Sequence, residues 1–378
     1  MKTSIVLAAA ILASAGTCAR ATDAQSAGFA SNRFEPSERG SEWFVNESLD
    51  FRGAPRPLAG VLFDWAYKPL LLFPRDDVQG DRRAQVITDQ TFLHAGGALV
   101  VAQRLRVGVN VPFAIYQHGD ELEGIAIAAR APSKAALGDV RLSSDAILFG
   151  AYGAILRGAV GAQLFLPTGS RSQFTGDGTV RVLPRFLFAG DIGGFVYATK
   201  LGVMIRPFDG TFEGRPLGSE LVFSVAVGLK ANDRFVFGPE LYGSTALTRD
   251  DPFRTRNTPL ELLIGGHLTL GDDFQVGTAI GPGLTRGDGS PSMRVIISIE
   301  VTPDECVDKD GDGICLAQDA CPDVDGVRTN DPKTNGCPPP GDPHEGVSPK
   351  VPAPPATVSP PPPTPPPSAP TEPEKKHD

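Results

Sequence analysis

Residues 105–116 read Leu-Arg-Val-Gly-Val-Asn-Val-Pro-Phe-Ala-Ile-Tyr, and every odd-numbered position among them is apolar. Successive side chains of a β-strand point to opposite faces, so this segment would present one apolar face and one mixed face. The same two-residue period recurs from about Leu58 to Val301, for example in residues 195–206 and 220–230. This is the period of strands and not the 3.6-residue period of helices. The pattern therefore predicts an all-β domain.

Short connections rich in turn-forming residues alternate with longer polar connections along this region. The short ones lie at Val101–Arg104, Gly150–Gly153, Gly190–Gly194, Ala231–Asp233 and Gly271–Asp273. The long ones lie at Lys68–Arg83, Gln117–Leu137, Pro167–Gly178, Pro207–Pro216, Arg249–Asn257 and Arg286–Pro291. The short connections would close five hairpins, and further strands are expected at Leu58–Tyr67 and Met293–Val301. About twelve strands are therefore predicted, in an antiparallel up-and-down β-barrel over residues 57–302.

Polar side chains occupy the face opposite the apolar one. They are Arg106, Arg141, Asp145, Arg157, Gln163, Arg181, Arg185, Lys200, Arg206, Glu220, Lys230, Glu240, Glu261 and Arg294. A soluble β-sandwich could also expose such charges, but it would not need regular hairpins with all long loops on one side. We therefore favour a transmembrane barrel in the cell outer membrane, surrounded by lipid, with its turns in the periplasm. An even strand count returns both ends of the barrel domain to the periplasmic side.

The lumen of a twelve-stranded barrel would hold charges of both signs, with Arg and Lys in excess. An open lumen would then show a weak anion preference, whereas a closed lumen would contain an internal ion-pair network. Residues 22–56 precede the barrel, and the part around Trp43, Phe44 and Val45 has poor periodicity. This segment is expected either to plug the lumen or to lie on the periplasmic rim.

The first 21 residues resemble a secretory signal, because Lys2 is followed by an apolar run from Ile5 to Ala13 and by small residues. No later segment has the run of about 18 apolar residues that a transmembrane helix needs. The net charge of -9 argues against nucleic acid as a partner. Four cysteines remain after the signal, all between Cys306 and Cys337, and they allow three disulfide connectivities.

A calcium-binding loop is predicted directly after the barrel. Asp308, Asp310, Asp312 and Asp319 stand at positions 1, 3, 5 and 12 of a D-x-D-x-D-G loop, and Ile314 would contribute its backbone carbonyl. Alternate oxygen ligands converge on a hard cation, and a glycine at position 6 permits the sharp turn. Ca²⁺ is therefore the expected cofactor, with a solvated acidic turn as the alternative.

Residues 303–338 resemble a thrombospondin type 3 repeat, through the Asp/Cys sequence that begins at Pro303 and closes with Asn335-Gly-Cys-Pro338. Together with Arg33-Phe-Glu-Pro-Ser-Glu-Arg-Gly-Ser-Glu-Trp-Phe44, Leu166-Pro-Thr-Gly-Ser-Arg171, Phe174-Thr-Gly-Asp-Gly-Thr179 and Gly281-Pro-Gly-Leu-Thr-Arg286, the chain resembles OmpA-family outer-membrane proteins. Within this resemblance the preferred disulfides are Cys321–Cys337, where each cysteine precedes a proline, and Cys306–Cys315.

Family members usually end in a peptidoglycan-binding domain, whereas residues 339–378 of this sequence are Pro-rich and are expected to form a disordered spacer. Cell-wall or periplasmic components are candidate partners of this tail. No catalytic motif is visible, so we expect no enzyme. The predicted function is a structural envelope role together with a narrow porin-like channel. The alternatives are a dedicated small-solute porin, an adhesin through Arg286-Gly287-Asp288, and a barrel phospholipase.

Overall fold

The computed structural model describes residues 28–52, 55–72, 84–119, 134–207, 211–212, 215–231, 234–248, 252–271, 273–303, 309–312, 314, 319–329, 331 and 333–339. The chain divides into two compact units, Met1–Cys306 and Val307–Asp378, each of which is described by itself.

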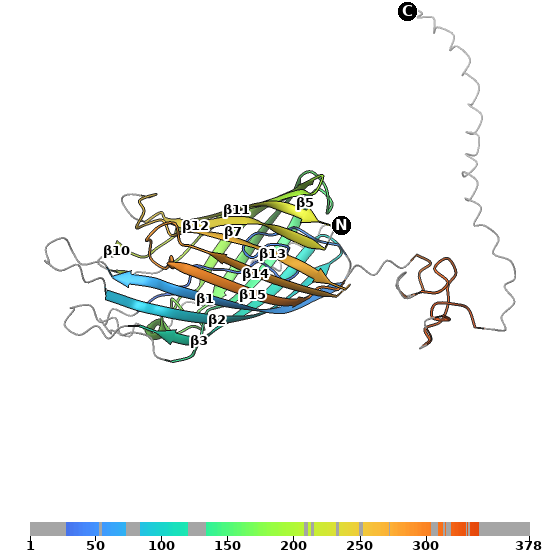
Figure 1. Ribbon diagram of the computed structural model, residues 1–378, viewed down its shortest axis with the longest axis horizontal. Coiled ribbons are helices and arrows are strands. Elements are labelled where there is room, and N and C mark those ends of the chain that lie inside the picture. Colours follow the sequence, from blue (N-terminus) through green and yellow to red (C-terminus); the bar gives the residue numbers. More distant parts are fainter. Residues whose placement is uncertain are drawn as a thin grey trace, which may run out of the picture. The chain divides into compact units, whose positions relative to one another are not determined.

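The first unit is a closed barrel of twelve antiparallel strands, as predicted (Figure 1). The strands are β1 (Arg56–Leu72), β2 (Ala84–Val101), β3 (Leu105–His118), β5 (Val140–Phe149), β6 (Arg157–Leu166), β7 (Arg181–Ile192), β8 (Phe195–Met204), β11 (Glu220–Ala231), β12 (Phe235–Ala246), β13 (Leu260–Leu270), β14 (Phe274–Gly281) and β15 (Met293–Val301). Each strand pairs with its neighbours in the sequence order of this series, and β1 also pairs with β15. That last pairing closes the sheet on itself, so every strand has two partners.

The remaining elements are short. They are β4 (Ala136–Leu137), which extends the pairing of β3, the two-stranded sheet of β9 (Thr211–Phe212) and β10 (Arg215–Pro216), and the 3-10 helix η1 (Arg171–Gln173). No helix formed by the described residues has the length and apolar character needed to cross a membrane.

Short turns connect the strands at one end of the barrel, at the positions that the turn residues predict. Gly193 and Gly194 join β7 to β8 with φ angles of 62° and 89°, a left-handed backbone that glycine adopts at little cost. Ala59 in β1 lies opposite Val301 in β15. The barrel domain therefore begins and ends at the same rim, as an even number of strands requires.

The distribution of polarity across the wall is the reverse of that in a soluble protein. In β3, the Arg106 side chain is 2% exposed whereas its apolar neighbour Val107 is 39% exposed. The same alternation continues along the other strands, where the outward positions are Leu, Val, Ile and Phe. Of the inward residues named from the sequence, all are buried except Lys230, which is partly buried. An apolar exterior around a charged interior is the arrangement of a barrel that contacts lipid.

Candidate functional site

The lumen of the barrel is filled by residues 28–52, which we call the plug. The plug contains no strand or helix, and most of its residues are buried. Its first residues contact the long connections, since the N–H of Ala30 donates to Asp177 and the Arg33 side chain to the carbonyl of Asp288. Its last residues lie near the short turns, where Arg52 stacks over the Tyr152 ring at 4.0 Å. The plug therefore runs through the barrel from one end to the other.

Glu240 on β12 fixes the middle of the plug. Its carboxylate accepts hydrogen bonds from the backbone N–H groups of Phe44, Val45 and Asn46, at 2.6, 3.0 and 3.0 Å, and from the Asn46 side chain at 3.0 Å. Two strands away in the sheet, Lys200 of β8 donates to the carbonyl of Val45 at 3.0 Å. Buried backbone groups need such partners. One wall carboxylate therefore satisfies three consecutive amides that lie outside any secondary structure.

Three buried arginines lie on β3, β5 and β7 and share their acidic partners, and we call them the arginine cluster (Arg106, Arg141 and Arg185). Arg106 pairs with Glu47 of the plug at 2.8 Å, and Arg185 contacts both Glu38 and Glu47 at 3.4 Å. Arg141 pairs with Glu38 at 3.2 Å and with Glu35 at 3.3 Å. The wall itself contributes one acid to this group, Asp145, at 2.8 Å from both Arg106 and Arg185.

Further ion pairs join the plug to strands on other sides of the barrel. Arg39 pairs with Glu300 of β15 at 3.1 Å, Arg33 with Glu220 of β11 at 2.8 Å, and Glu42 with Lys230 of β11 at 2.9 Å. Buried charges are tolerated when each is paired and hydrogen-bonded. Of the two lumen arrangements considered from the sequence, the described residues form the ion-paired one, and the plug supplies many of the partners.

Apolar side chains of the plug build two small cores inside the polar lumen. Phe34, Phe44 and Val45 pack against Leu62 of β1 and Ile296 of β15. The second core contains Trp43, Leu49 and Phe51 with residues of β1, β2, β7, β8 and β12. Burial of one such side chain contributes about 1.5–3 kcal/mol at most. These cores add apolar contacts to the ion pairs between the plug and the wall.

Glycines on the inner wall make room for the plug. A Cβ at Gly96 would lie 2.4 Å from the Arg39 Nε, one at Gly108 would lie 2.5 Å from a Glu38 carboxylate oxygen, and one at Gly228 would lie 2.8 Å from the Trp43 ring. The sequence analysis assigned no role to these glycines, and it did not name the wall acids Asp64, which pairs with Arg294, and Glu300, which pairs with Arg39. The sequence did contain an indication of the plug, because an acidic segment precedes a barrel whose inward arginines outnumber its inward acids.

Asp177, in the connection between β6 and β7, closes the network at the end with the long connections. It accepts from the N–H of Ala30 at 2.9 Å and from the Arg206 Nε at 2.8 Å. Burial raises the pKa of the Asp177 carboxyl, but Arg181 and Arg206 oppose this and hold the pKa below its ordinary value. Asp177 is therefore ionised at neutral pH and fixes the start of the plug.

One Ser–His contact bears on the phospholipase alternative. Ser298 Oγ lies 3.4 Å from His267 Nε2, and both residues are buried on the inner wall. The Phe44 ring of the plug covers His267, with ring centres 4.1 Å apart. This pair lies inside the barrel, whereas barrel phospholipases place such residues on the lipid-facing wall.

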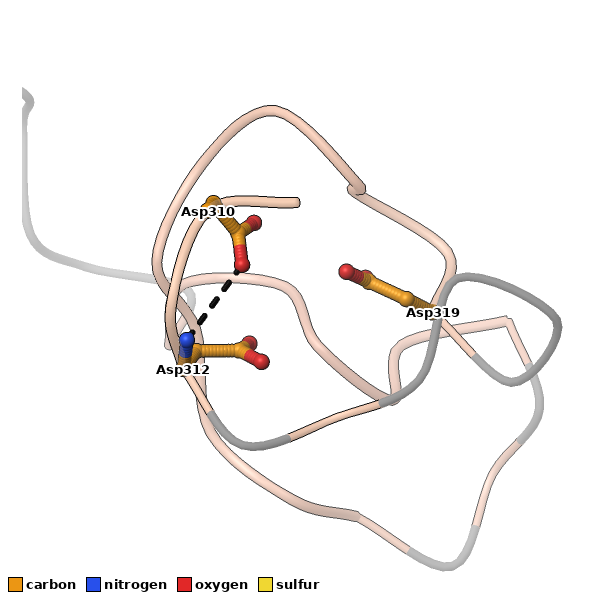
Figure 2. Close-up of side chains that lie close together, drawn as sticks. All are labelled: Asp310, Asp312 and Asp319. Atoms are coloured by element: carbon orange, nitrogen blue, oxygen red, sulfur yellow. Dashed lines mark hydrogen bonds between the residues drawn. The ribbon is translucent and has the colours of Figure 1, made fainter. Parts of the chain in front are cut away.

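In the second unit, the structure brings together three of the predicted calcium ligands. Figure 2 shows Asp310, Asp312 and Asp319 pointing toward one another, with carboxylate oxygens that all lie within 4.8 Å of each other. Ile314 is buried, and its N–H donates to Asp312 at 2.8 Å. Asp308 lies outside the described residues. Partial desolvation and the like charges of Asp312 and Asp319 raise the pKa of Asp310.

The residues around this cluster fit a hard cation in two respects. The Oδ2 atoms of Asp310 and Asp319 have no hydrogen-bond partner among the described residues, so they are available as ligands. The other oxygens are positioned by backbone N–H groups, from Cys321 to Asp319 at 2.8 Å and from Gly326 to Asp312 at 3.1 Å. The predicted Cys321–Cys337 disulfide is present beside them. Cys306 and Cys315 lie outside the described residues.

No protein-family model matches the sequence. No curated protein matches it either. Among solved structures, an outer membrane channel from Pseudomonas putida F1 is similar, with a TM-score of 0.52 and 13% identity over 71% of this chain and 99% of the channel. The NanC porin aligns with a TM-score of 0.42 and 8% identity over 65% of this chain and 99% of the porin. LpxR from Salmonella typhimurium aligns with a TM-score of 0.34 and 12% identity over 64% of this chain and 99% of LpxR. The first likeness shows the fold alone, a β-barrel like that of this channel, and the other two are too distant to add to it.

Proposed function

We propose that this protein is an outer-membrane channel that its own plug holds closed in the resting state. The observation that carries the proposal is a charged lumen inside an apolar barrel, filled from end to end by residues 28–52. The channel from Pseudomonas putida F1, which has the same fold, supports a channel role. The polar contacts described above support closure, because wall charges such as Arg106, Lys200 and Glu240 have their partners in the plug.

The plug could leave its position without unfolding the barrel. It contributes no strand to the sheet, so the backbone ladder of all twelve strands is independent of it. Most of its contacts are side-chain ion pairs and hydrogen bonds, together with the two apolar cores. A conformational change limited to the plug therefore leaves the wall intact, which is what a channel that opens requires.

Gly96 offers a direct test of the plugged-channel proposal. In Gly96→Leu the new side chain would enter the space of Arg39, and overpacking of this kind costs about 1–3 kcal/mol. We expect the variant to conduct about tenfold more current in planar bilayers than the unmodified protein, which should show only rare openings. Gly97→Leu is the matched control, because a Cβ there meets only a backbone oxygen at 3.5 Å. Equal currents from all three proteins would contradict the proposal.

We also propose that Asp308, Asp310, Asp312 and Asp319, with the carbonyl of Ile314, bind one Ca²⁺. The convergence of three of these carboxylates, with two unpartnered oxygens, supports this assignment. Calcium would stiffen a segment that has few apolar residues of its own. The resemblance to a thrombospondin type 3 repeat and to OmpA-family proteins supports a periplasmic position, a structural role in the envelope, and contact of the Pro-rich tail with cell-wall or periplasmic components.

A further inference from the structure

The arginine cluster has a charge balance that only the plug completes. The cluster and the neighbouring Lys200 carry four positive charges, and the wall places one acid, Asp145, among them. This leaves three positive charges on the wall, and the plug brings three carboxylates to them, those of Glu35, Glu38 and Glu47. A barrel without the plug would present an uncompensated cationic surface in its lumen.

The geometry of the cluster suits carboxylates specifically. Arg185 contacts the carboxylates of Glu38 and Glu47 at the same time, so two separate carboxylates converge on one guanidinium. The planar guanidinium is the side chain best matched to carboxylate oxygens. The Nε atoms of Arg106 and Arg141 are buried and have no hydrogen-bond partner among the described residues, so the cluster has donors that the plug leaves unused.

We infer that the arginine cluster is a binding site for an organic anion with two or more carboxylate groups, and that Glu38 and Glu47 occupy this site when the channel is closed. The inference rests on the proposed function, because it names the solute class that such a channel would take. A solute of this kind competes with Glu38 and Glu47 for the same guanidinium groups. Binding of the solute therefore favours the state in which the plug has left the cluster.

Limited trypsin digestion of the folded full chain in detergent tests this inference. The bond after Arg39 is the reporter, because the Arg39 side chain is buried in the plugged barrel. Citrate serves as the polycarboxylate probe, and sodium acetate at equal ionic strength is the control for screening. We expect citrate to speed cleavage after Arg39 at least tenfold over acetate. Equal rates in citrate and acetate would overturn the inference.

Variants separate specific binding of citrate from a nonspecific release of the plug. The double variant Glu38→Gln/Glu47→Gln keeps the shape of the plug, and its cleavage after Arg39 should increase at a citrate concentration at least tenfold lower. Arg141→Gln should lose the difference between citrate and acetate, whereas Arg104→Gln, in the exposed turn between β2 and β3, should keep it. A citrate response that survives Arg141→Gln would assign the effect to another site and overturn the inference.

Conductance measured on the same proteins separates this inference from the proposed function. If citrate releases the plug but no variant conducts, the anion site stands and the channel proposal fails. If Gly96→Leu conducts but citrate never changes cleavage after Arg39, the channel proposal stands and the anion site fails.

Discussion

Among single residues, Glu240 attaches the wall to three consecutive residues of the plug. It is the acceptor for three backbone N–H groups and one side-chain amide, and it is 1% exposed. Hydrogen bonds to a charged group contribute about 1.5–3 kcal/mol each, and Glu240→Gln removes the charge while it keeps one acceptor oxygen. We expect the plug to leave its position up to about 30-fold more often, measured as the rate of trypsin cleavage after Arg39.

The control for Glu240→Gln is Asp273→Asn, which changes an exposed acid at the short turn between β13 and β14. This control should digest like the unmodified protein. If Glu240→Gln digested no faster than Asp273→Asn, the carboxylate would not be what holds the plug.

Asp177 gives the plug a pH dependence at its first residues. Because its pKa is lowered in the folded protein, its contribution to stability is complete above the unfolded pKa of about 3.9 and is lost as the pH falls through the folded value. We therefore expect hydrogen exchange in residues 28–34, corrected for intrinsic rates, to stay slow from pH 8 to about pH 4 and to rise below it. Asp177→Asn should show fast exchange at neutral pH. Rising exchange already at pH 6 in the unmodified protein would contradict this assignment.

Among the elements, the strands were predictable from the sequence, whereas the plug was only one of two alternatives for the segment before the barrel, and its contacts were not predictable. Strands such as β3 carry a two-residue period because lipid and lumen select opposite side chains at alternate positions. Turn residues such as Gly193 and Gly194 then fix where each hairpin begins. The plug has no regular alternation of apolar and polar residues, since its side chains contact many different strands of the wall. Its partners, such as Glu300 for Arg39, lie far away in the sequence, so only the folded chain reveals them.

The acidic loop in the second unit is a segment whose order should depend on calcium. We expect removal of Ca²⁺ by a chelator to increase protease cleavage within residues 304–337 and to leave the barrel strands resistant. Asp319→Asn should mimic chelation, because it removes an unpartnered ligand oxygen from the cluster. Asp325→Asn, outside the cluster, is the matched control. Identical cleavage with and without calcium would reject the calcium assignment.

At the scale of the whole molecule, the apolar exterior makes the folded state depend on an amphiphile. Side chains such as Phe186, which is 57% exposed, and Leu229, which is 66% exposed, would face water in plain buffer. We expect the folded protein to be monodisperse only in detergent or lipid, and to migrate faster in SDS gels before heating than after it. A protein that stayed monodisperse in buffer without any amphiphile would not be a membrane barrel.

The path of the plug also bears on how the protein is assembled. A peptide that lies along the axis of a finished cylinder would have to be threaded through it by its free end, past every charged group on the wall. The alternative is that the peptide is laid on the open sheet, and that the seam between β1 and β15 forms last and encloses it. In the second route, the peptide is in place before the barrel closes, so its side chains guide how the strands around it come together.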